Sequence, residues 1–311
     1  MWAPGSVLYA PAVLAGSPSR RLHSALLGLS AVVLFGVAGC GPRASTTTSG
    51  GPAVDPRPAP PLRSAGEPSG TCPDLSRSGM TTLTSAGVER EAIVLLPPGS
   101  AEGAPVFFVW HGLGATAKSM VPRMGLRELA LAGAVVVVPQ ALPGSSTGWT
   151  VDLPRVDDMA LFDDLRACLA RDLKVDLERV VSSGFSAGGL WTSLLLFKRA
   201  DALAGVLEMS GGVIPPILSY ETPSWSAPAL LLDGGRNDTY RKGPLLVRFD
   251  QNTAKLRDRL RGDGHLVVHC VHDRGHRVPS WRIELIHRWA LTQRYGEARP
   301  LDEAPPGCAI R

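Results

Sequence analysis

A serine flanked by glycines is the clearest sign of chemistry in this sequence. The segment Gly184-Phe185-Ser186-Ala187-Gly188 follows a short apolar run and precedes a helical one. In that position, G-x-S-x-G is typical of a sharp strand-to-helix turn that strains the serine backbone and presents its Oγ to solvent. Ser186 would also lie at a helix N-terminus, where backbone N–H groups favour negative charge. We therefore expect Ser186 to be a nucleophile rather than an ordinary turn residue.

A base and a carboxylate that could activate this serine both lie further along the chain. His276 is the expected base, because it lies on the loop Gly275–Pro279, a few residues beyond an apolar run. Asp233 and Asp238 could each orient the imidazole. Asp238 is favoured because it lies beyond a Gly-Gly turn, from which a loop can bring a carboxylate to the far side of the histidine. Asp233 remains the alternative.

A second glycine-containing loop, His111-Gly112-Leu113-Gly114, follows the apolar run 105–110. Glycine lets a backbone approach a substrate oxygen closely. We expect an oxyanion hole made by the N–H of Ala187 together with that of Leu113 or Gly114. His111 itself is expected to brace the loop through hydrogen bonds.

The spacing of His265, His269, His272 and His276 could suggest a metal site. However, His269 and His272 are an odd number of residues apart and would point to opposite faces of a strand. We expect no metal and no cofactor.

Short apolar runs alternate with helical segments from about residue 71. The expected strands are a hairpin pair within 82–96 and then 105–110, 134–138, 179–183, 205–209, 229–232 and 265–271. The expected helices are 117–132, 158–172, 187–199, 250–262 and 280–293. Continuous apolar runs are typical of strands buried on both faces. The pattern predicts an α/β fold with a mostly parallel central sheet and helices on both faces, and chemistry at the carboxyl ends of the strands.

Composition excludes some classes of protein. The chain has 311 residues, 44% of them hydrophobic and 19% charged, which rules out wholesale disorder. Its 32 Lys and Arg against 28 Asp and Glu give +4, and three of these charges belong to residues 1–70, so residues 71–311 carry +1. We find no clustered basic face and expect no nucleic-acid partner.

The N-terminal segment has the features of an export signal. Arg20-Arg21 precede an almost uncharged run that ends in Val37-Ala38-Gly39-Cys40. This ending resembles the lipobox of bacterial lipoproteins, which implies a signal peptide over 1–39, a lipidated Cys40 and attachment to a membrane of the cell envelope. An ordinary signal peptide cleaved elsewhere, giving a secreted protein, is the alternative. We also expect the true start codon to lie within residues 1–20.

A linker and four further cysteines follow. Residues 41–70 are rich in Pro, Ser, Thr and Gly, and we expect 40–70 to be an extended, mobile tether to a domain over 71–311. Export implies an oxidising compartment, where four cysteines can form two disulfides. The sequence leaves the pairing open among Cys72, Cys168, Cys270 and Cys308.

Together, these motifs resemble the α/β-hydrolase superfamily, and in particular its exported branch of polyhydroxybutyrate depolymerases, feruloyl esterases and acetylxylan esterases. The resemblance covers about residues 83–282 and rests on Trp110-His111-Gly112, Asp157-Asp158, Asp176–Val180, Gly184–Gly189, Gly235-x-x-Asp238 and Gly275-His276-x-x-Pro279. The order Ser186, Asp238, His276 is the one expected for this fold. Arg277-Val278-Pro279 replaces a common Trp-Pro-Gly, and Gly234 replaces a common histidine, which leaves the acyl or sugar specificity open.

The resemblance implies a serine esterase that forms an acyl-enzyme. Only about twenty residues separate the strands ending near Met209 and beginning near Ala229, too few for a helical lid. We therefore expect an open site for bulky or polymer-borne esters, with Trp149, Trp225 and Trp281 as candidate walls. The alternatives are a serine peptidase of the same fold and a non-catalytic surface lipoprotein, and the natural ester and the oligomeric state stay open.

Overall fold

A nine-stranded sheet is the centre of the computed structural model, which describes residues 55–143, 148–149 and 157–310. Its order is β1-β2-β4-β3-β5-β6-β7-β10-β11. The strands are β1 (Gly79–Ser85), β2 (Val88–Leu95), β3 (Val106–Trp110), β4 (Val135–Gln140), β5 (Val180–Phe185), β6 (Gly205–Met209), β7 (Ala229–Asp233), β10 (Val267–Val271) and β11 (Cys308–Ile310). The strands from β4 to β10 run parallel, and β1, β2 and β11 pair antiparallel at the two edges.

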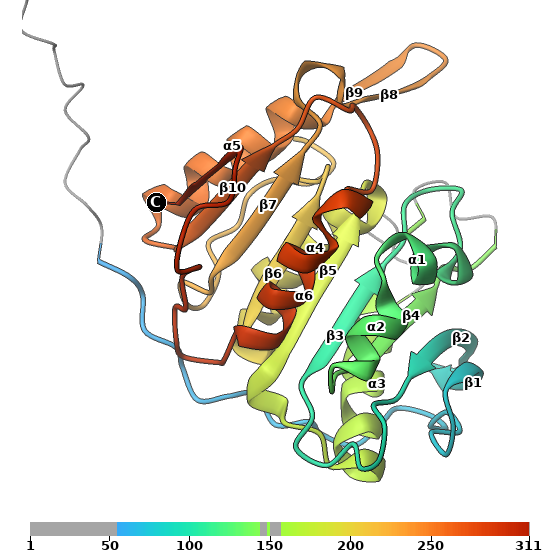
Figure 1. Ribbon diagram of the computed structural model, residues 1–311. Coiled ribbons are helices and arrows are strands. Elements are labelled where there is room, and N and C mark those ends of the chain that lie inside the picture. The colour runs from blue at the N-terminus through green and yellow to red at the C-terminus, as the bar shows by residue number, and fades with distance from the viewer. Residues whose placement is uncertain (1–54, 144–147, 150–156, 311) are drawn as a thin grey trace, which may run out of the picture. The chain divides into compact units, whose positions relative to one another are not determined.

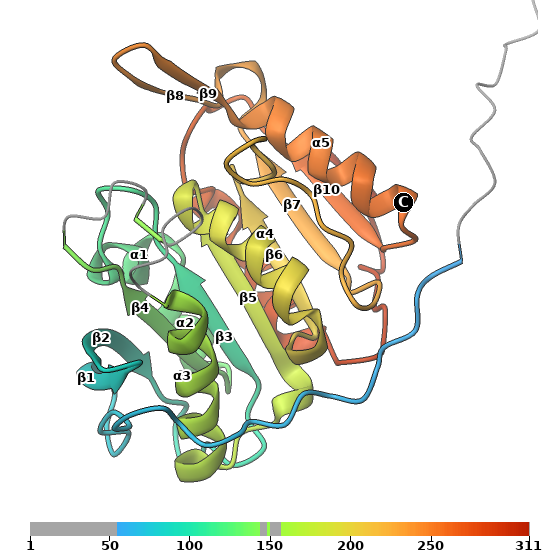
Figure 2. The same cartoon turned by 180° about the vertical axis from the view of Figure 1, so that it is seen from behind.

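Helices cover both faces of this sheet, which explains the continuous apolar runs. Every residue of β3, β5, β6 and β7 is buried. One face carries α1 (Ala117–Arg123), α2 (Leu126–Leu131) and α6 (Ile283–Thr292) (Figure 1). The other face carries α3 (Asp158–Leu173), α4 (Ala187–Arg199) and α5 (Phe249–Gly262) (Figure 2). The predicted fold class is therefore confirmed.

Two local features differ from the sequence-based expectation, and a third agrees with it. The single helix expected over 117–132 is two helices. The first ends at Arg123 with Met124 as its C-cap, and Gly125, with a left-handed φ of 58°, begins the second. A two-stranded hairpin of β8 (Thr239–Lys242) and β9 (Leu245–Arg248), which was not predicted, follows β7. Residues 210–228, between β6 and β7, contain no helix, in agreement with the expected absence of a large lid.

The expectation of a mobile tether is wrong for residues 55–70. This segment is extended, but it runs along the domain and makes specific contacts with it (Figure 2). The Arg63 N–H donates to the Asp201 carbonyl at 2.7 Å, and the Ser69 N–H donates to the Asp164 carboxylate at 2.6 Å. Backbone groups that pair with the domain hold the segment in place, although its composition cannot form a core of its own.

The four cysteines of the described residues form two disulfides, Cys72–Cys168 and Cys270–Cys308. The first joins the segment before β1 to α3, and the second joins β10 to the edge strand β11. Such bonds are typical of proteins from oxidising compartments.

The structure leaves the N-terminal predictions untouched. The signal peptide over 1–39, the lipidated Cys40 and the first part of the linker lie outside the described residues. Among the residues that are described, no helix combines the length and the apolar character of a membrane span.

Candidate active site

The turn between β5 and α4 holds Ser186 in a strained backbone conformation. Its φ of 56° and ψ of −116° are rare for a residue with a side chain. The turn is fixed because the Ser186 N–H donates to the Met209 carbonyl on β6 at 2.9 Å. A Cβ at Gly184 would lie 2.0 Å from the Gly188 carbonyl oxygen, and one at Gly188 would lie 2.0 Å from that of Trp110. Only glycine therefore allows α4 to start this close to β3 and β5.

Ser186, His276 and Asp238 meet at this turn. The Ser186 Oγ lies 2.9 Å from His276 Nε2, and His276 Nδ1 lies 2.6 Å from Asp238 Oδ1. Asp238 is fully buried, and its other oxygen accepts the Gly234 N–H at 2.8 Å. With Nδ1 donating to the carboxylate, Nε2 is free to accept the serine proton.

Two phenylalanines hold the imidazole of His276 in its plane. The ring of Phe249 stacks on it at 4.5 Å and 14°, and that of Phe185 lies at 4.8 Å. The Phe249 N–H donates to the Asp238 carbonyl at 2.9 Å. The start of α5 is thus tied to both the carboxylate and the base.

The alternative carboxylate, Asp233, faces a different histidine. Asp233 Oδ2 lies 2.6 Å from His269 Nε2, and its Oδ1 accepts the Gly235 N–H at 2.8 Å. The structure therefore brings Asp238, and not Asp233, to His276. The pairing of Asp233 with His269 was missed in the sequence, because it depends on β7 and β10 being neighbours.

The loop after β3 packs directly against the nucleophile. A Cβ at Gly112 would lie 3.2 Å from the Ser186 Cβ. His111 braces this loop: its Nε2 accepts the Ala141 N–H at 3.1 Å, so its Nδ1 donates to the Gly112 carbonyl at 2.9 Å. Burial lowers the pKa of His111, which keeps the ring neutral in this role. Leu113 follows Gly112 in the chain, and Ala187 follows Ser186. The N–H groups of Leu113 and Ala187 are the expected oxyanion donors.

A pocket of about 410 Å3 opens at Ser186. Its lining is mostly apolar and comes from several distant segments: Gly112, Leu113, Gly114, Ala115, Arg123, Phe185, Ser186, Ala187, Leu190, Ile214, Ile217, Tyr240, Leu245, Val247, Phe249 and His276. The unpredicted hairpin β8–β9 contributes Tyr240, Leu245 and Val247. No sequence motif marked these three residues.

The three tryptophans expected as substrate walls do not line this pocket. Trp149 is fully buried. Its indole N–H donates to the His111 carbonyl at 2.8 Å, so it supports the loop that begins at His111. Trp225 is buried at the far end of α4, where it donates to the Ala200 carbonyl. Trp281 is 37% exposed, but it lies in another hollow, under Arg274 at 4.2 Å. The wall assignment is corrected for all three.

The chain resembles curated esterases over part of its length, although no family model matches it. Feruloyl esterase D of Neurospora crassa is 30% identical over 169 residues, which are 49% of this chain and 56% of that protein. Probable feruloyl esterase C of Aspergillus terreus is 31% identical over 173 residues, 50% of this chain and 62% of that protein. The chain thus matches less than two thirds of either relative.

Among solved structures, native sOPH aligns with a TM-score of 0.60 at 19% identity, covering 78% of this chain and 96% of that one. The chain has the α/β-hydrolase fold. At this level of identity the structural likeness shows the fold alone. In this chain Ser186, Asp238 and His276 follow the carboxyl ends of β5, β7 and β10, the edge at which parallel sheets of this kind bind their ligands.

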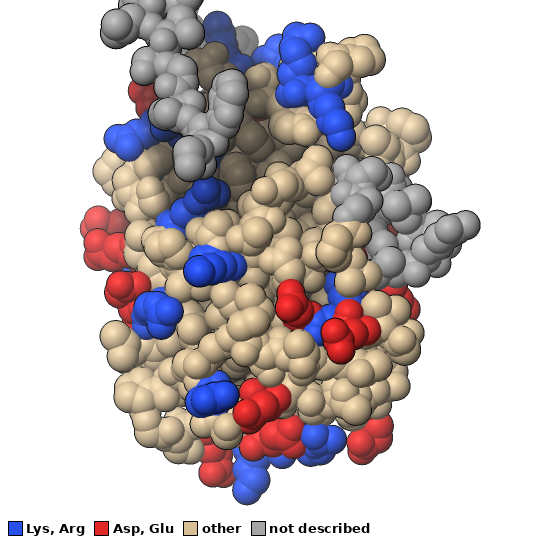
Figure 3. All heavy atoms as spheres, turned by 90° about the vertical axis from the view of Figure 1, so that its right-hand side faces the viewer, with Lys and Arg blue, Asp and Glu red and all other residues tan. Residues whose placement is uncertain are grey.

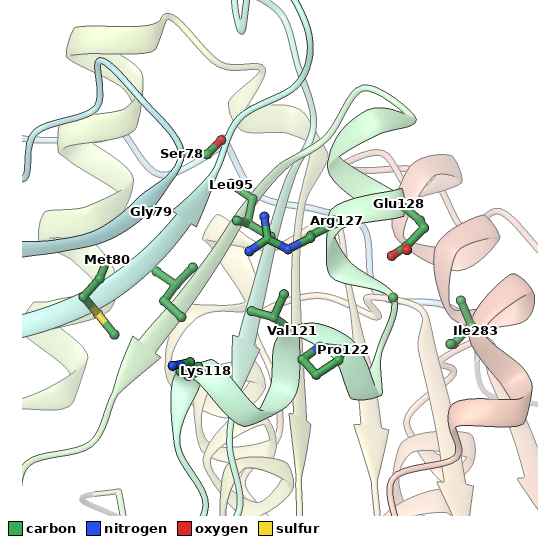
Figure 4. A pocket seen from close by; sticks show the side chains of 12 residues that line it. Ser78, Gly79, Met80, Leu95, Lys118, Val121, Pro122, Arg127, Glu128 and Ile283 are labelled. Atoms are coloured by element: carbon green, nitrogen blue, oxygen red, sulfur yellow. The ribbon is translucent and has the colours of Figure 1, made fainter.

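A larger cavity, of about 960 Å3, lies elsewhere in the molecule, between β1–β2 and the helices α1 and α2. Figure 4 shows it bordered by Met80 and Leu95 on one side and by Val121 and Pro122 on the other. Its lining includes no histidine, so it has no counterpart of the hydrogen-bonded pair formed by Ser186 and His276. The smaller pocket at Ser186 is the candidate site because the chemistry is there.

Positive and negative side chains are interspersed on the face seen in Figure 3 and form no continuous basic patch there. Nor do the described residues bring together three side chains that could hold a metal ion.

Proposed function

We propose that this protein is a serine hydrolase that cleaves carboxylic esters through an acyl-enzyme on Ser186. His276 Nε2 takes the hydroxyl proton as Oγ attacks the ester carbonyl, and then donates it to the leaving alcohol. Water, activated by the same nitrogen, releases the acid. The proposal rests on one observation: the imidazole of His276 joins the Ser186 Oγ at 2.9 Å to the buried Asp238 carboxylate at 2.6 Å.

The remaining roles follow from the geometry around this pair. Asp238 fixes the imidazole tautomer and stabilises the charged ring that forms during attack. The N–H of Ala187, with that of Leu113 or Gly114, binds the oxyanion, and loss of one such donor typically costs about 3 kcal/mol of transition-state stabilisation. No step calls for a cofactor.

The proposed substrates are bulky or polymer-borne esters, with feruloyl, acetyl-polysaccharide and hydroxybutyrate esters as the candidates. The feruloyl esterases among the relatives support this class. So does the connection between β6 and β7, in which residues 210–228 contain no helix to cover the site.

The test is hydrolysis of an ester panel that covers aryl acetates, feruloyl esters, acetylated xylan and hydroxybutyrate oligomers, with peptide amides as the contrast. We expect hydrolysis of at least one ester class, loss of that activity in Ser186→Ala, and labelling by a fluorophosphonate only when Ser186 is present. Cleavage of amides alone would favour a peptidase. A folded protein with neither turnover nor labelling would favour a non-catalytic surface lipoprotein.

We also propose export to the cell envelope and a lipid anchor on Cys40. The lipobox-like Val37-Ala38-Gly39-Cys40 and the two disulfides support it. Metabolic labelling with a radioactive fatty acid should mark the wild-type protein and not Cys40→Ala. Equal labelling of the two would refute the anchor, and release of the unlabelled protein into the medium would fit an ordinary signal peptide.

A further inference from the structure

The hairpin β8–β9 is inserted between two parts of the candidate active site. It begins at Thr239, directly after Asp238, and ends at Arg248, directly before Phe249. Its base is closed by the hydrogen bond from the Phe249 N–H to the Asp238 carbonyl, and the Phe249 ring stacks on His276. These contacts with Asp238 and His276 therefore fix the position of the hairpin beside the candidate active site.

The strand register divides the hairpin into two faces. Tyr240 pairs with Val247, and Lys242 pairs with Leu245. Because residues directly opposite each other in a ladder project to the same side, these four share one face. Three of the four, all except Lys242, line the pocket at Ser186.

The other face carries Leu246, which pairs with Arg241. Neither of these residues lines the pocket. Leu245 and Leu246 are thus neighbours in the chain with similar exposure, 50% and 44%, but lie on opposite faces of the same hairpin.

The hairpin side chains that line the pocket, Tyr240, Leu245 and Val247, are largely apolar although the hairpin itself is exposed. Ile214 and Ile217, from the connection after β6, also line the pocket, and Ile217 is 46% exposed. No carboxylate lines the pocket. Exposed apolar side chains that converge on a nucleophile lose contact with water when an apolar group binds between them, which favours binding.

We infer that the β8–β9 hairpin selects esters with an extended apolar group, which binds between Leu245 and Val247 on one side and Ile217 on the other. This inference rests on the proposed ester hydrolysis and narrows its substrate class: esters that are short on both the acyl and the alcohol side use the pocket poorly, and longer alkyl or aryl groups on one side fill it. Each methylene that moves from water into the pocket raises kcat/KM by about fourfold.

The experiment compares two matched variants, Leu245→Ala and Leu246→Ala, on two substrate series. One series extends the acyl group of p-nitrophenyl esters from acetate to butyrate and hexanoate. The other extends the alcohol of acetate esters from ethyl to butyl and hexyl. The series in which kcat/KM rises with length identifies which side of the ester occupies the pocket.

For the wild type we expect a rise of about tenfold or more from the two-carbon to the four-carbon member of one series. Leu245→Ala should lower kcat/KM for the longest member about three- to tenfold and leave the shortest within about twofold. Leu246→Ala should change neither. Ile217→Ala, in the connection after β6, should reproduce the effect of Leu245→Ala.

Two results would overturn the inference: no dependence on length in either series, or a dependence that Leu245→Ala and Leu246→Ala change equally. In both cases the proposed ester hydrolysis would stand, provided that Ser186→Ala still abolished turnover. Absence of turnover of every ester by the wild type would instead refute the proposed function, and the inference with it.

Discussion

Two aspartate–histidine pairs lie at the same edge of the sheet, and their hydrogen bonds have the same length. Asp238 faces His276 at 2.6 Å, and Asp233 faces His269 at 2.6 Å. Both carboxylates also accept a backbone N–H, from Gly234 and Gly235 respectively. Judged by the pair alone, either could orient a catalytic base.

The difference lies on the second nitrogen of each imidazole. That of His276 meets the Ser186 Oγ at 2.9 Å, whereas that of His269 meets the Arg257 guanidinium at 3.3 Å. His276 lies on a loop and lines an open pocket, while His269 is buried within β10. A nucleophile and an opening, rather than the carboxylate–imidazole bond, distinguish a candidate site from a structural contact.

Of the substitutions that test this comparison, Asp238→Asn should cause the largest loss of kcat. The oxygen of the amide would keep accepting the Gly234 N–H, so its NH2 group would face His276 Nδ1. The imidazole would then carry its proton on Nε2 and could not accept the serine proton. We expect kcat to fall about 10⁴-fold, measured on the best ester of the panel.

Asp233→Asn is the matched control for that substitution. It changes the other pair in the same way, and we expect kcat to stay within about tenfold of the wild type, because His269 does not reach Ser186. An equal loss of kcat in the two variants would mean that both pairs serve the reaction.

The contact between the two loops offers a second way to test the site. A Cβ at Gly234 would lie 2.1 Å from the carbonyl oxygen of Gly275, the residue before His276. Gly234→Ala should therefore push the base away from Ser186 and lower kcat by about 10²-fold, since a shift of about 1 Å can have such an effect. Gly262→Ala, where an added Cβ meets nothing within 4 Å, is the control and should leave kcat unchanged.

The stability of Asp233→Asn tests whether the pair formed by Asp233 and His269 has a structural role. In Asp233→Asn the amide NH2 would face His269 Nε2, and the displaced imidazole proton on Nδ1 would face the Arg257 guanidinium, donor against donor. We expect the free energy of unfolding, measured by urea titration, to fall by about 1–3 kcal/mol. An unchanged midpoint would show that the second pair contributes nothing to stability.

Much of this arrangement could be predicted from the sequence. The alternation of apolar runs and helical segments predicts the sheet, and a parallel sheet brings its carboxyl ends to one edge. That rule makes Ser186, Asp238 and His276 candidates for one site, although they are far apart in the chain. The glycine pattern around Ser186 is enough to predict the turn, because neighbouring backbone comes so close to Gly184 and Gly188 that neither position has room for a side chain.

Other features depend on neighbours that no local pattern reveals. The pair Asp233–His269 follows from the register of β7 against β10. Each strand of the hairpin β8–β9 has only four residues and includes at least one Lys or Arg. Segments this short and mixed give no clear periodic signal in the sequence. Positions in or beside loops make the three tryptophans candidate walls, but burial and indole hydrogen bonds decide where such side chains lie.

Another buried carboxyl group, Glu208 on β6, extends the comparison, because it has no imidazole beside it. It contacts the Ser193 hydroxyl, which itself donates to the Gly212 carbonyl at 2.9 Å. Burial raises the pKa of Glu208 to about 8, so the group is protonated at neutral pH and can donate to Ser193 Oγ.

This protonation predicts a small effect of pH on stability. The carboxyl of the unfolded chain ionises near its ordinary pKa of 4.5, whereas that of the folded chain ionises only near 8. Between these values unfolding releases a proton, so rising pH favours the unfolded state through this group. Glu208→Gln cannot ionise and should lose less Tm than the wild type between pH 5 and pH 8, measured by calorimetry. A difference in Tm between the two proteins that stayed constant across this range would mean that Glu208 is already ionised at pH 5, and that a buried carboxylate here needs no imidazole partner.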